Sequence, residues 1–246
     1  MRPLTTAETL QVWEEAAGLT PFEKPLRLLA IACSVNDLNQ LSHLSIGERD
    51  ARLLQLREWM FGNTLRNKVS CPKCTEIIEW ETDTKDLHLQ SFTSSFSVRE
   101  LSLNEEGYSI QFRLPDSLDI ARINRRDSEE AIYRKLISNC IVTIDKGGQQ
   151  YSPADLPGSV LEALDRKMGE EDPQADLRVN LTCPACRHTW ETYFDIAGYL
   201  WSEINNWAQR LLQEVYLLAK AFSWSERDIL AMSAQRRHLY LKMLNA

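Results

Sequence analysis

The sequence has no apolar run that approaches the roughly 20 residues needed to cross a membrane, which excludes an ordinary transmembrane helix. Positive charge is also scarce. The chain has 28 Lys and Arg against 35 Asp and Glu, and its formal net charge is −7 at pH 7. This balance disfavours a nucleic-acid partner, whose phosphates must be neutralised by Lys and Arg. The first residues, MRPLTTAETL, contain no charged and apolar leader, so we expect a cytoplasmic protein with reduced thiols.

Patterns that carry catalysis are missing as well. There is no glycine-rich phosphate loop and no serine in a nucleophile elbow, and the pair Gly147 and Gly148 indicates a turn or hairpin. Asp and Glu fall mostly at predicted helix starts, where the helix dipole accounts for them. The sequence therefore predicts a protein that is not an enzyme. The four histidines have no spacing that forms a metal site: His43, His88, His188 and His238.

The chain does contain two Cys-Pro-x-Cys motifs, CPKC at 71–74 and CPAC at 183–186, far apart in the sequence. A short apolar strand pattern precedes each motif and an alternating run follows it. Two thiolates from each motif make the tetrahedral four-sulfur set that Zn²⁺ prefers. Such a site has no open position for water or substrate, so we expect a structural zinc. The predicted ligands are Cys71, Cys74, Cys183 and Cys186.

Other uses of the cysteines remain open at this point. Six cysteines could form disulfides, and a single Cys-x-x-Cys can be a redox pair, although two motifs with matching flanks fit both alternatives poorly. His188 could replace one thiolate, but its place after Cys186 favours a solvent-facing position on the outgoing strand. Cys33 and Cys140 lie in apolar runs, and we expect both to be small buried side chains.

The rest of the chain predicts helices on both sides of the motifs and a mixed segment between them. Capping-box spacings start helices at Thr5 and Ser45, with ends at Gly18 and Gly62, and another helix is expected over 26–33. Alternation in SFSVREL and YSIQFRL predicts a β-hairpin over 95–101 and 108–114. Further helices are expected over 116–123, from 127–130 to about 142, and over 156–168.

After Phe194 the chain is expected to be helical to its end, with apolar residues at three- and four-residue steps. These residues either pack onto the zinc module and the N-terminal helices or form a docking face, since Trp and Tyr are favoured interface anchors. Two arginines near the end could bind an acidic partner or phosphate, or form a solvated face. The candidate partner-binding residues are Trp201, Trp207, Tyr216, Phe222, Arg236 and Arg237.

These patterns together predict an α+β protein built on a split zinc ribbon, whose two CPxC hairpins are separated in sequence. The predicted parts are an N-terminal helical segment (1–66), the ribbon (67–84 and 177–196), an insertion with a β-hairpin and helices (85–176), and C-terminal helices (197–246).

Four stretches that together sample most of the chain carry a resemblance to a known family: SIGERDARLLQLREWMFG, FRLPDSLDIARI, LTCPACRHTWETYFDIAGYLWSEI and EVYLLAKAFSWSERDILAMSAQRRHLYLKML. They resemble the T-even phage baseplate hub assembly protein family, whose relatives also occur in loci for contractile, phage-tail-like injection systems. The resemblance implies an accessory role in building a baseplate hub, as a transient chaperone or a minor structural subunit. It implies hub or spike proteins as partners, and it carries over no catalytic residues.

Two alternative functions stay open. A nucleic-acid-binding zinc-ribbon accessory factor is one, because cysteine motifs of this type are common in such proteins, although the net charge of −7 disfavours it. An enzyme whose zinc serves only its fold is the other, and it would need a deep pocket with convergent carboxylates of shifted pKa.

Overall fold

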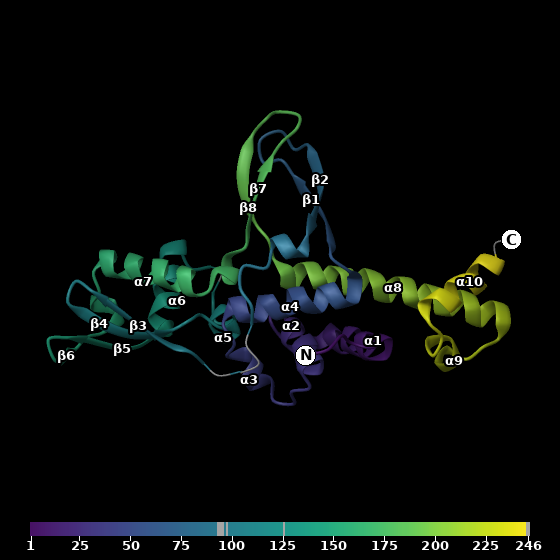
Figure 1. Cartoon of the computed structure of the whole chain (residues 1–246), viewed down its shortest axis with the longest axis horizontal. Coiled ribbons are helices and arrows are strands. Elements are labelled where there is room, and N and C mark those ends of the chain that lie inside the picture. Colours follow the sequence, from purple (N-terminus) through teal and green to yellow (C-terminus); the bar gives the residue numbers. More distant parts are fainter. Residues whose placement is uncertain (93–95, 97, 125, 245–246) are drawn as a thin grey trace.

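A computed structural model of the chain describes residues 1–92, 96, 98–124 and 126–244. Figure 1 shows a helical body from which three parts extend: a pair of β-hairpins, a sheet covered by helices, and the end of one long C-terminal helix. The combination of helices with small separate sheets confirms the predicted α+β class. In the described part of the chain, no helix is both long and apolar enough to cross a membrane.

The central body is built around α4, whose leucines Leu53, Leu54 and Leu56 are fully buried. Thr5 and Ser45 cap the first helix and α4 through their side chains, as the sequence predicted. The first helix ends as a 3-10 turn at the expected stop (Ala16–Gly18). The helices of the body are α1 (Thr6–Glu15), α2 (Glu23–Cys33), α3 (Leu38–Ser42), α4 (Ile46–Phe61) and the first half of α8 (Ile196–Phe222).

The insertion forms a four-stranded antiparallel sheet with its own core, in which Ile110, Phe112, Val160 and Leu164 are fully buried. The strands follow the order β3 (Glu100–Glu105), β4 (Tyr108–Arg113), β5 (Ile141–Lys146) and β6 (Gln149–Gln150). Its helices are α5 (Ser117–Ala121), α6 (Glu129–Cys140) and α7 (Gly158–Glu171).

Three predicted boundaries in the insertion are wrong. The strand expected over 95–101 begins only at Glu100, and residues 95 and 97 of that range lie outside the described residues. The helix expected over 116–123 is the shorter α5, capped by Asp116. The helix expected to reach about 142 ends at Cys140, because the β-branched run that follows pairs with β4 as strand β5.

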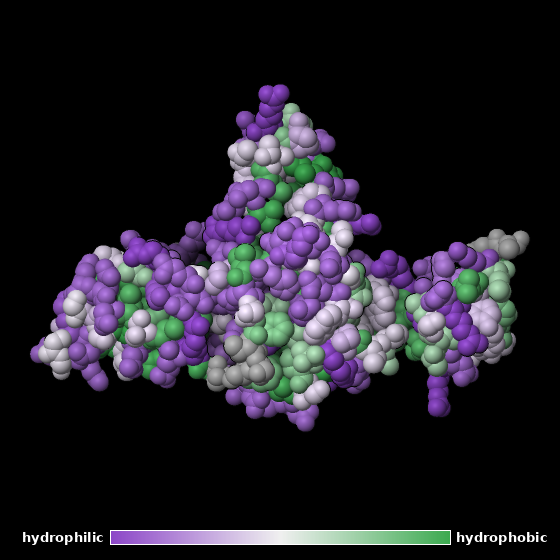
Figure 2. All heavy atoms as spheres, in the orientation of Figure 1, coloured by the Kyte–Doolittle hydropathy of each residue, from purple (hydrophilic) through white to green (hydrophobic). Residues whose placement is uncertain are grey.

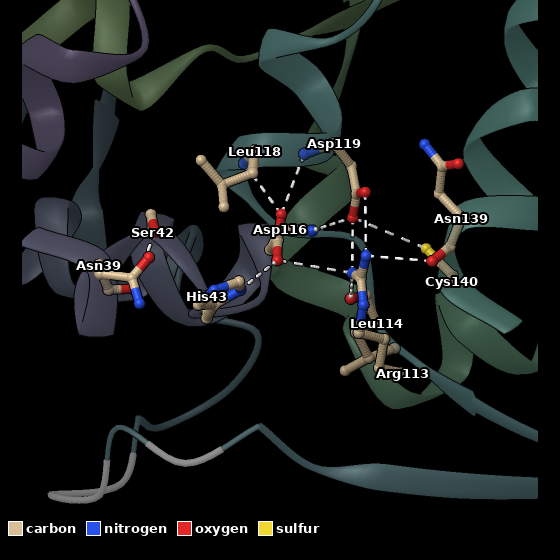
Figure 3. Close-up of polar contacts among 10 residues, drawn as sticks. All are labelled: Asn39, Ser42, His43, Arg113, Leu114, Asp116, Leu118, Asp119, Asn139 and Cys140. Atoms are coloured by element: carbon tan, nitrogen blue, oxygen red, sulfur yellow. Dashed lines mark hydrogen bonds and ion pairs between the residues drawn. The ribbon is translucent and has the colours of Figure 1, made fainter. Parts of the chain in front are cut away.

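A cluster of charged residues joins the insertion to the body (Figure 3). Asp116 caps α5 through the backbone nitrogens of residues 118 and 119, and its Oδ2 lies 2.9 Å from Nδ1 of His43 in the body. Arg113 donates to both carboxylate oxygens of Asp119, at 2.6 and 3.0 Å. Burial would raise the pKa of Asp119, but the hydrogen bonds from Arg113 and Asp116 hold it below its usual range. Cys140 lies beside Asp119 of this cluster, and burial raises the pKa of its thiol to about 12, which disfavours the reactive thiolate.

A second junction depends on a glycine at the start of α4. The backbone nitrogen of Gly47 donates to Oδ2 of buried Asp172 at 2.9 Å, and Oδ1 of Asp172 accepts from Gln90 at 2.9 Å. A Cβ on residue 47 would overlap Oδ1 of Asp172 and would lie 2.9 Å from the backbone nitrogen of Ala175. Only glycine therefore lets the 3-10 turn Pro173–Asp176 approach α4 this closely.

Gly47→Ala is expected to destabilise the protein by about 1–3 kcal/mol, because overpacking a filled site forces the neighbouring backbone to move. Denaturant unfolding measures this loss. Gly169→Ala is the matched control, since a Cβ at this position in α7 meets nothing within 4 Å and should be neutral or slightly stabilising. Equal unfolding midpoints for the two variants would contradict the proposed role of Gly47.

The two remaining sheets are separate antiparallel hairpins that project together from the body (Figure 1). The first pairs β1 (Thr64–Ser70) with β2 (Ile77–Asp83), and the second pairs β7 (Arg178–Thr182) with β8 (Thr189–Tyr193). An isolated two-stranded hairpin is marginally stable in water. Contacts beyond the strand pairing must therefore hold each of them in place.

The helix α8 continues past the body and ends the molecule as an arm. We define the C-terminal arm as residues 211–244, which comprise the end of α8 with α9 (Glu226–Leu230) and α10 (Ala234–Leu244). The buried stripe of α8 packs against α1, α2 and α4 in its first half and against α9 and α10 in its second. This stripe follows the predicted three- and four-residue steps: Ile196, Leu200, Ile204, Ala208, Leu211, Val215 and Leu218.

Candidate metal centre

The first cysteine motif forms a tight turn between β1 and β2. The backbone nitrogen of Cys71 donates to the carbonyl of Glu76 at 2.8 Å, and that of Thr75 donates to the carbonyl of Cys71 at 2.9 Å. Thr75 adopts the left-handed conformation with φ of 62°. This turn aims both thiols of the motif away from the strands and toward the second hairpin.

The second motif repeats the same turn. The backbone nitrogen of Cys183 donates to the carbonyl of His188 at 2.9 Å, and that of Arg187 donates to the carbonyl of Cys183 at 2.9 Å. Arg187 has φ of 57°, and it stands at the position that Thr75 occupies in the first motif. Two segments far apart in sequence thus build matching halves of one site.

The four thiols converge where the tips of the hairpins meet. Cys71 Sγ lies 3.7 Å from Cys186 Sγ, Cys74 Sγ lies 3.6 Å from Cys183 Sγ, and all four sulfurs lie within 4.8 Å of one another. Tetrahedral coordination at Zn–S distances of about 2.3 Å would place the sulfurs about 3.8 Å apart. A disulfide requires an S–S distance of about 2.05 Å, and all six cysteines are free. The four cysteines could therefore hold a metal ion, and their arrangement does not fit disulfides.

Neighbouring thiols shift one another's pKa in this cluster. Burial would raise the pKa of the Cys71 thiol, but hydrogen bonds from the backbones of Cys74 and Lys73 lower it to about 7. A backbone hydrogen bond from Glu76 would lower the pKa of Cys74, but the neighbouring thiols, led by Cys186, raise it to about 12. Four thiols this close cannot all ionise unless a positive ion balances their charge. Four soft sulfur donors within 4.8 Å of one another are compatible with Zn²⁺.

His188 lies outside the sulfur set. Its ring stacks on Trp190 with the centroids 5.7 Å apart and the planes 11° from parallel. It precedes β8 and is half-buried, so the predicted solvent-facing position on the strand is wrong. Of the two cysteines expected to be buried, Cys140 is buried and Cys33 is half-buried at the end of α2.

Alternate residues of the hairpins form an apolar layer between them. Val69, Ile78 and Trp80 of the first hairpin and Val179 and Trp190 of the second are half-buried, while the residues between them are exposed. Figure 2 shows the hydrophobic residues gathered along the facing sides of the two hairpins. This layer is thin, so the sulfur cluster at the tips supplies a cross-link that packing alone does not.

At their base the hairpins are tied to the body by residues that the sequence did not indicate. The hydroxyl of Tyr199 in α8 accepts from the backbone nitrogen of Arg66 at 2.8 Å and donates to its carbonyl at 3.0 Å. Arg57 of α4 donates to the carbonyls of Gly62 and Thr64 at 2.6 and 2.8 Å. These partners are distant in sequence or belong to a turn, so no local pattern could have predicted them.

The candidate partner residues fall into different environments. Trp201 packs against the body core, with the Lys24 amine 4.9 Å above its ring, and Trp207 is half-buried. Phe222 stacks on Trp224 inside the arm at 4.5 Å between centroids. Tyr216 is 61% exposed on the arm, so of these four aromatics it is the one presented to solvent.

The two neighbouring arginines of α10 also differ. Arg237 is buried, and it donates to Glu214 of α8 at 3.0 Å and to the carbonyl of Met232 at 2.7 Å. It holds α10 onto α8 and is not available to a partner, which corrects its place among the partner-binding candidates. Arg236 is exposed beside the ring of Tyr240. Successive helical residues point about 100° apart, so one of two adjacent arginines can face inward.

The charges on the hairpins bear on the nucleic-acid alternative. Cross-strand carboxylates pair with the cations that lie on the strands, which leaves little uncompensated positive charge along the strands for a phosphate backbone. The ion pairs are Arg66–Glu81 at 3.0 Å, Lys68–Glu79 at 2.9 Å and Arg178–Glu191 at 3.0 Å.

Comparison with known proteins gives one match. A family model described as T4 bacteriophage base plate protein matches residues 23–201. The matched region runs from the first residue of α2 into α8 and includes both cysteine motifs, and it stops before the C-terminal arm. No curated protein and no solved structure matches the chain.

Proposed function

The chain belongs to the T4 bacteriophage base plate protein family, which supports a structural or assembly role in a phage baseplate, and we propose that it helps to build the baseplate hub. It acts there as a non-catalytic assembly factor or as a minor structural subunit, in a contractile tail or a related injection system. Its partners are hub or spike proteins, which it contacts through protein–protein interfaces. The observation that carries this proposal is the match over most of the chain.

A structural Zn²⁺ held by the four cysteines is the second part of the proposal. The sulfur spacing and the two matching turns support it. When bound, the ion cross-links the two hairpins and leaves no coordination position for a substrate. The hairpins then form the split zinc ribbon, which carries the insertion between its halves.

We propose that the chain is not an enzyme, because the hydrogen bonds of its buried carboxylates give them structural roles. Burial raises the pKa of Asp50 and of Asp172, a property that active-site acids often share. Asp50, however, accepts from Arg49 at 2.7 Å, and Asp172 accepts from Gly47 and Gln90. Both carboxylates hold helices and turns together, which supports a structural role for them and not a catalytic one.

The C-terminal arm is the proposed partner surface. Within residues 211–244 there are five Lys and Arg against three Asp and Glu, although the whole chain is acidic. Exposed apolar residues lie beside these cations (Figure 2). The family match ends at residue 201, so the arm is proposed from its own charge and exposed residues. The apolar residues are Tyr216, Leu217, Leu239, Met243 and Leu244.

Removing residues 223–246 is expected to abolish binding of the hub partner while zinc is retained, because the hairpins that carry the sulfur cluster and the arm extend from the body in different directions (Figure 1). Co-purification with the partner and metal analysis of the same preparation measure both properties. Tyr216→Asp, which changes an exposed side chain, should weaken binding by at least about tenfold without loss of folding. If both variants bind the partner as tightly as the native chain does, the arm is not the partner-binding surface.

The proposed role is tested by deleting the gene from a phage or injection-system locus. We expect few complete tails in electron micrographs, and restoration by the intact chain supplied from a plasmid. A chain lacking residues 223–246 should fail to restore assembly. Normal numbers of complete tails without the gene would contradict an assembly role.

A further inference from the structure

The last helix of the arm, α10, has two different sides. Its inner side packs on α8, where Arg237 is buried against Glu214, and Tyr240 and Leu241 join the small core of the arm. Its outer side is exposed to solvent, although it too carries apolar residues. Three exposed residues at steps of three and four lie on one face of the helix. We define them as the outer stripe of α10: Arg236, Leu239 and Met243.

The two apolar members of the outer stripe are open to solvent. Leu239 is 51% exposed and Met243 is 66% exposed. They lie one helical turn apart, which is the spacing of the side chains that anchor one helix against another. A helix that is apolar on two sides is expected to be covered on both. Within the described chain only the inner side of α10 is covered, so the outer stripe indicates a second contact.

Arg236 gives the outer stripe a positive charge that the arm does not balance. Its guanidinium lies 5.7 Å from the centroid of the Tyr240 ring and donates to the Tyr240 hydroxyl at 3.5 Å, and it forms no ion pair with a described residue. The ion pair that the described arm does contain joins Arg237 to Glu214 on the inner side. Residues 234–244 include no Asp or Glu, so α10 itself supplies no carboxylate.

The helix dipole adds to this imbalance. α10 begins at Ala234, so Arg236 lies in the first turn, where the positive end of the dipole disfavours a cation and favours a carboxylate. The neighbouring helix α9 follows the usual pattern, with Glu226 and Asp228 in its own first turn. These two carboxylates keep their charge at the start of α9, and neither forms an ion pair with a described residue. The start of α10 therefore has two sources of positive charge and no acidic residue of its own.

The charge of the outer stripe selects among the partners that could cover it. Two copies of the stripe would bring like charges together, which disfavours a contact between two α10 helices. An anionic lipid surface would attract the stripe but would repel the rest of a chain whose net charge is −7. An acidic protein segment fits the stripe without this conflict, because its carboxylates meet Arg236 and the positive end of α10.

We infer that the outer stripe of α10 binds an acidic amphipathic helix of a partner protein. Leu239 and Met243 pack against the apolar side of that helix, since side chains three and four residues apart form the ridges of helix packing. A carboxylate beside this apolar side pairs with Arg236, whose guanidinium the Tyr240 ring already positions. The inference rests on the proposed function, in which the arm contacts the hub partner, and it adds the face of the arm and the chemistry of the partner.

The test uses the full chain with ¹³C in the methyl groups of its five methionines, of which only Met243 belongs to the outer stripe. Two acetylated helical peptides of about 18 residues are each added to about 1 mM. One has a stripe of Leu among Ala and Glu residues, and the other has Lys in place of each Glu. We expect the Glu peptide to shift the Met243 signal and to leave the signals of Met60 and Met168 unchanged. We expect the Lys peptide to bind at least about tenfold more weakly.

Variants locate the contact. Leu239→Asp should weaken binding of the Glu peptide by at least about tenfold, because it places a carboxylate in the apolar part of the stripe. Arg236→Glu should weaken it by at least about fivefold and should make the Lys peptide the tighter binder. Val142→Asp and Arg166→Glu make the same kinds of change at exposed residues of the insertion, and we expect them to leave the affinity unaltered.

Several results would overturn the inference: no shift of the Met243 signal, equal binding of the two peptides, or equal effects of stripe and control variants. If the hub partner still required residues 223–246 for co-purification in that case, the arm would keep its proposed role and only the chemistry of the stripe would be wrong. Binding of the chain to vesicles of phosphatidylcholine and phosphatidylserine that Leu239→Asp abolishes would assign the stripe to a lipid surface. A sedimentation coefficient of the chain alone that Leu239→Asp lowers would assign it to a second copy, and either result would also overturn the inference.

Discussion

Cys183→Ser is expected to lose bound zinc and to give insoluble or protease-sensitive protein. Cys183 is buried in the cluster, and its sulfur lies 3.6 Å from that of Cys74 in the other hairpin. Structural zinc contributes on the order of 10–16 kcal/mol of apparent binding free energy in small peptides, so loss of one thiolate removes a large stabilisation. The damage should begin in the hairpins, because neither the body core nor the insertion core contains the cysteines of the cluster.

The measurements are zinc content by mass spectrometry, melting temperature and the sites of limited proteolysis. Cleavage should concentrate in residues 64–83 and 178–193, and a chelator added to the native protein should reproduce the same pattern. Cys33→Ser is the matched control, since Cys33 is half-buried and lies outside the cluster. A soluble Cys183→Ser protein with the native melting temperature would contradict the proposal of a structural zinc.

Arg57→Met is expected to cost about 3–5 kcal/mol of unfolding free energy, because it leaves partners of a buried charge without their donor. The guanidinium, 2% exposed, donates to both carboxylate oxygens of Glu203 at 2.8 and 2.7 Å. It also donates hydrogen bonds to the carbonyls of Gly62 and Thr64. One side chain therefore joins α4, α8 and the first hairpin. Methionine retains most of the volume and removes every hydrogen bond.

Denaturant unfolding measures the effect, and Arg27→Met provides its control. Arg27 pairs with Glu15 at 2.8 Å, but each side chain is more than a third exposed, and exposed pairs contribute about 0–1 kcal/mol. A large loss for Arg57→Met beside a small one for Arg27→Met is the expected result. Similar losses for both would mean that Arg57 is not the tie between the body and the first hairpin.

Local signals in the sequence predicted the elements that depend on local interactions. Thr5 and Ser45 cap their helices because a hydroxyl three residues before a backbone N–H can reach it whatever the rest of the chain does. The stripe of α8 was visible because a helix that packs on one side repeats apolar residues every three or four positions.

The convergence of the cysteines could also be predicted, although the motifs are distant in sequence. A Cys-Pro-x-Cys turn presents two thiols and leaves both without partners unless a second pair is nearby. Two such turns in one chain therefore predict each other. The structure brings all four sulfurs together within 4.8 Å.

Features that depend on tertiary partners were not predictable from local patterns. The run after Cys140 continues a helical pattern, and it becomes β5 because the edge of β4 is there to pair with it. Arg237 was placed on a solvated or partner face because nothing nearby in sequence shows that Glu214 lies beneath it.

The role in baseplate assembly is tested by affinity purification of the tagged chain from its native host after nuclease treatment. The bound proteins are identified by mass spectrometry and compared with those of purified particles. If the chain takes part in building the baseplate hub, hub or spike subunits will be recovered with it. The presence or absence of this chain in finished particles then separates a structural subunit from a transient chaperone. Recovery of polymerase or ribosomal proteins, or of no tail protein, would contradict that role.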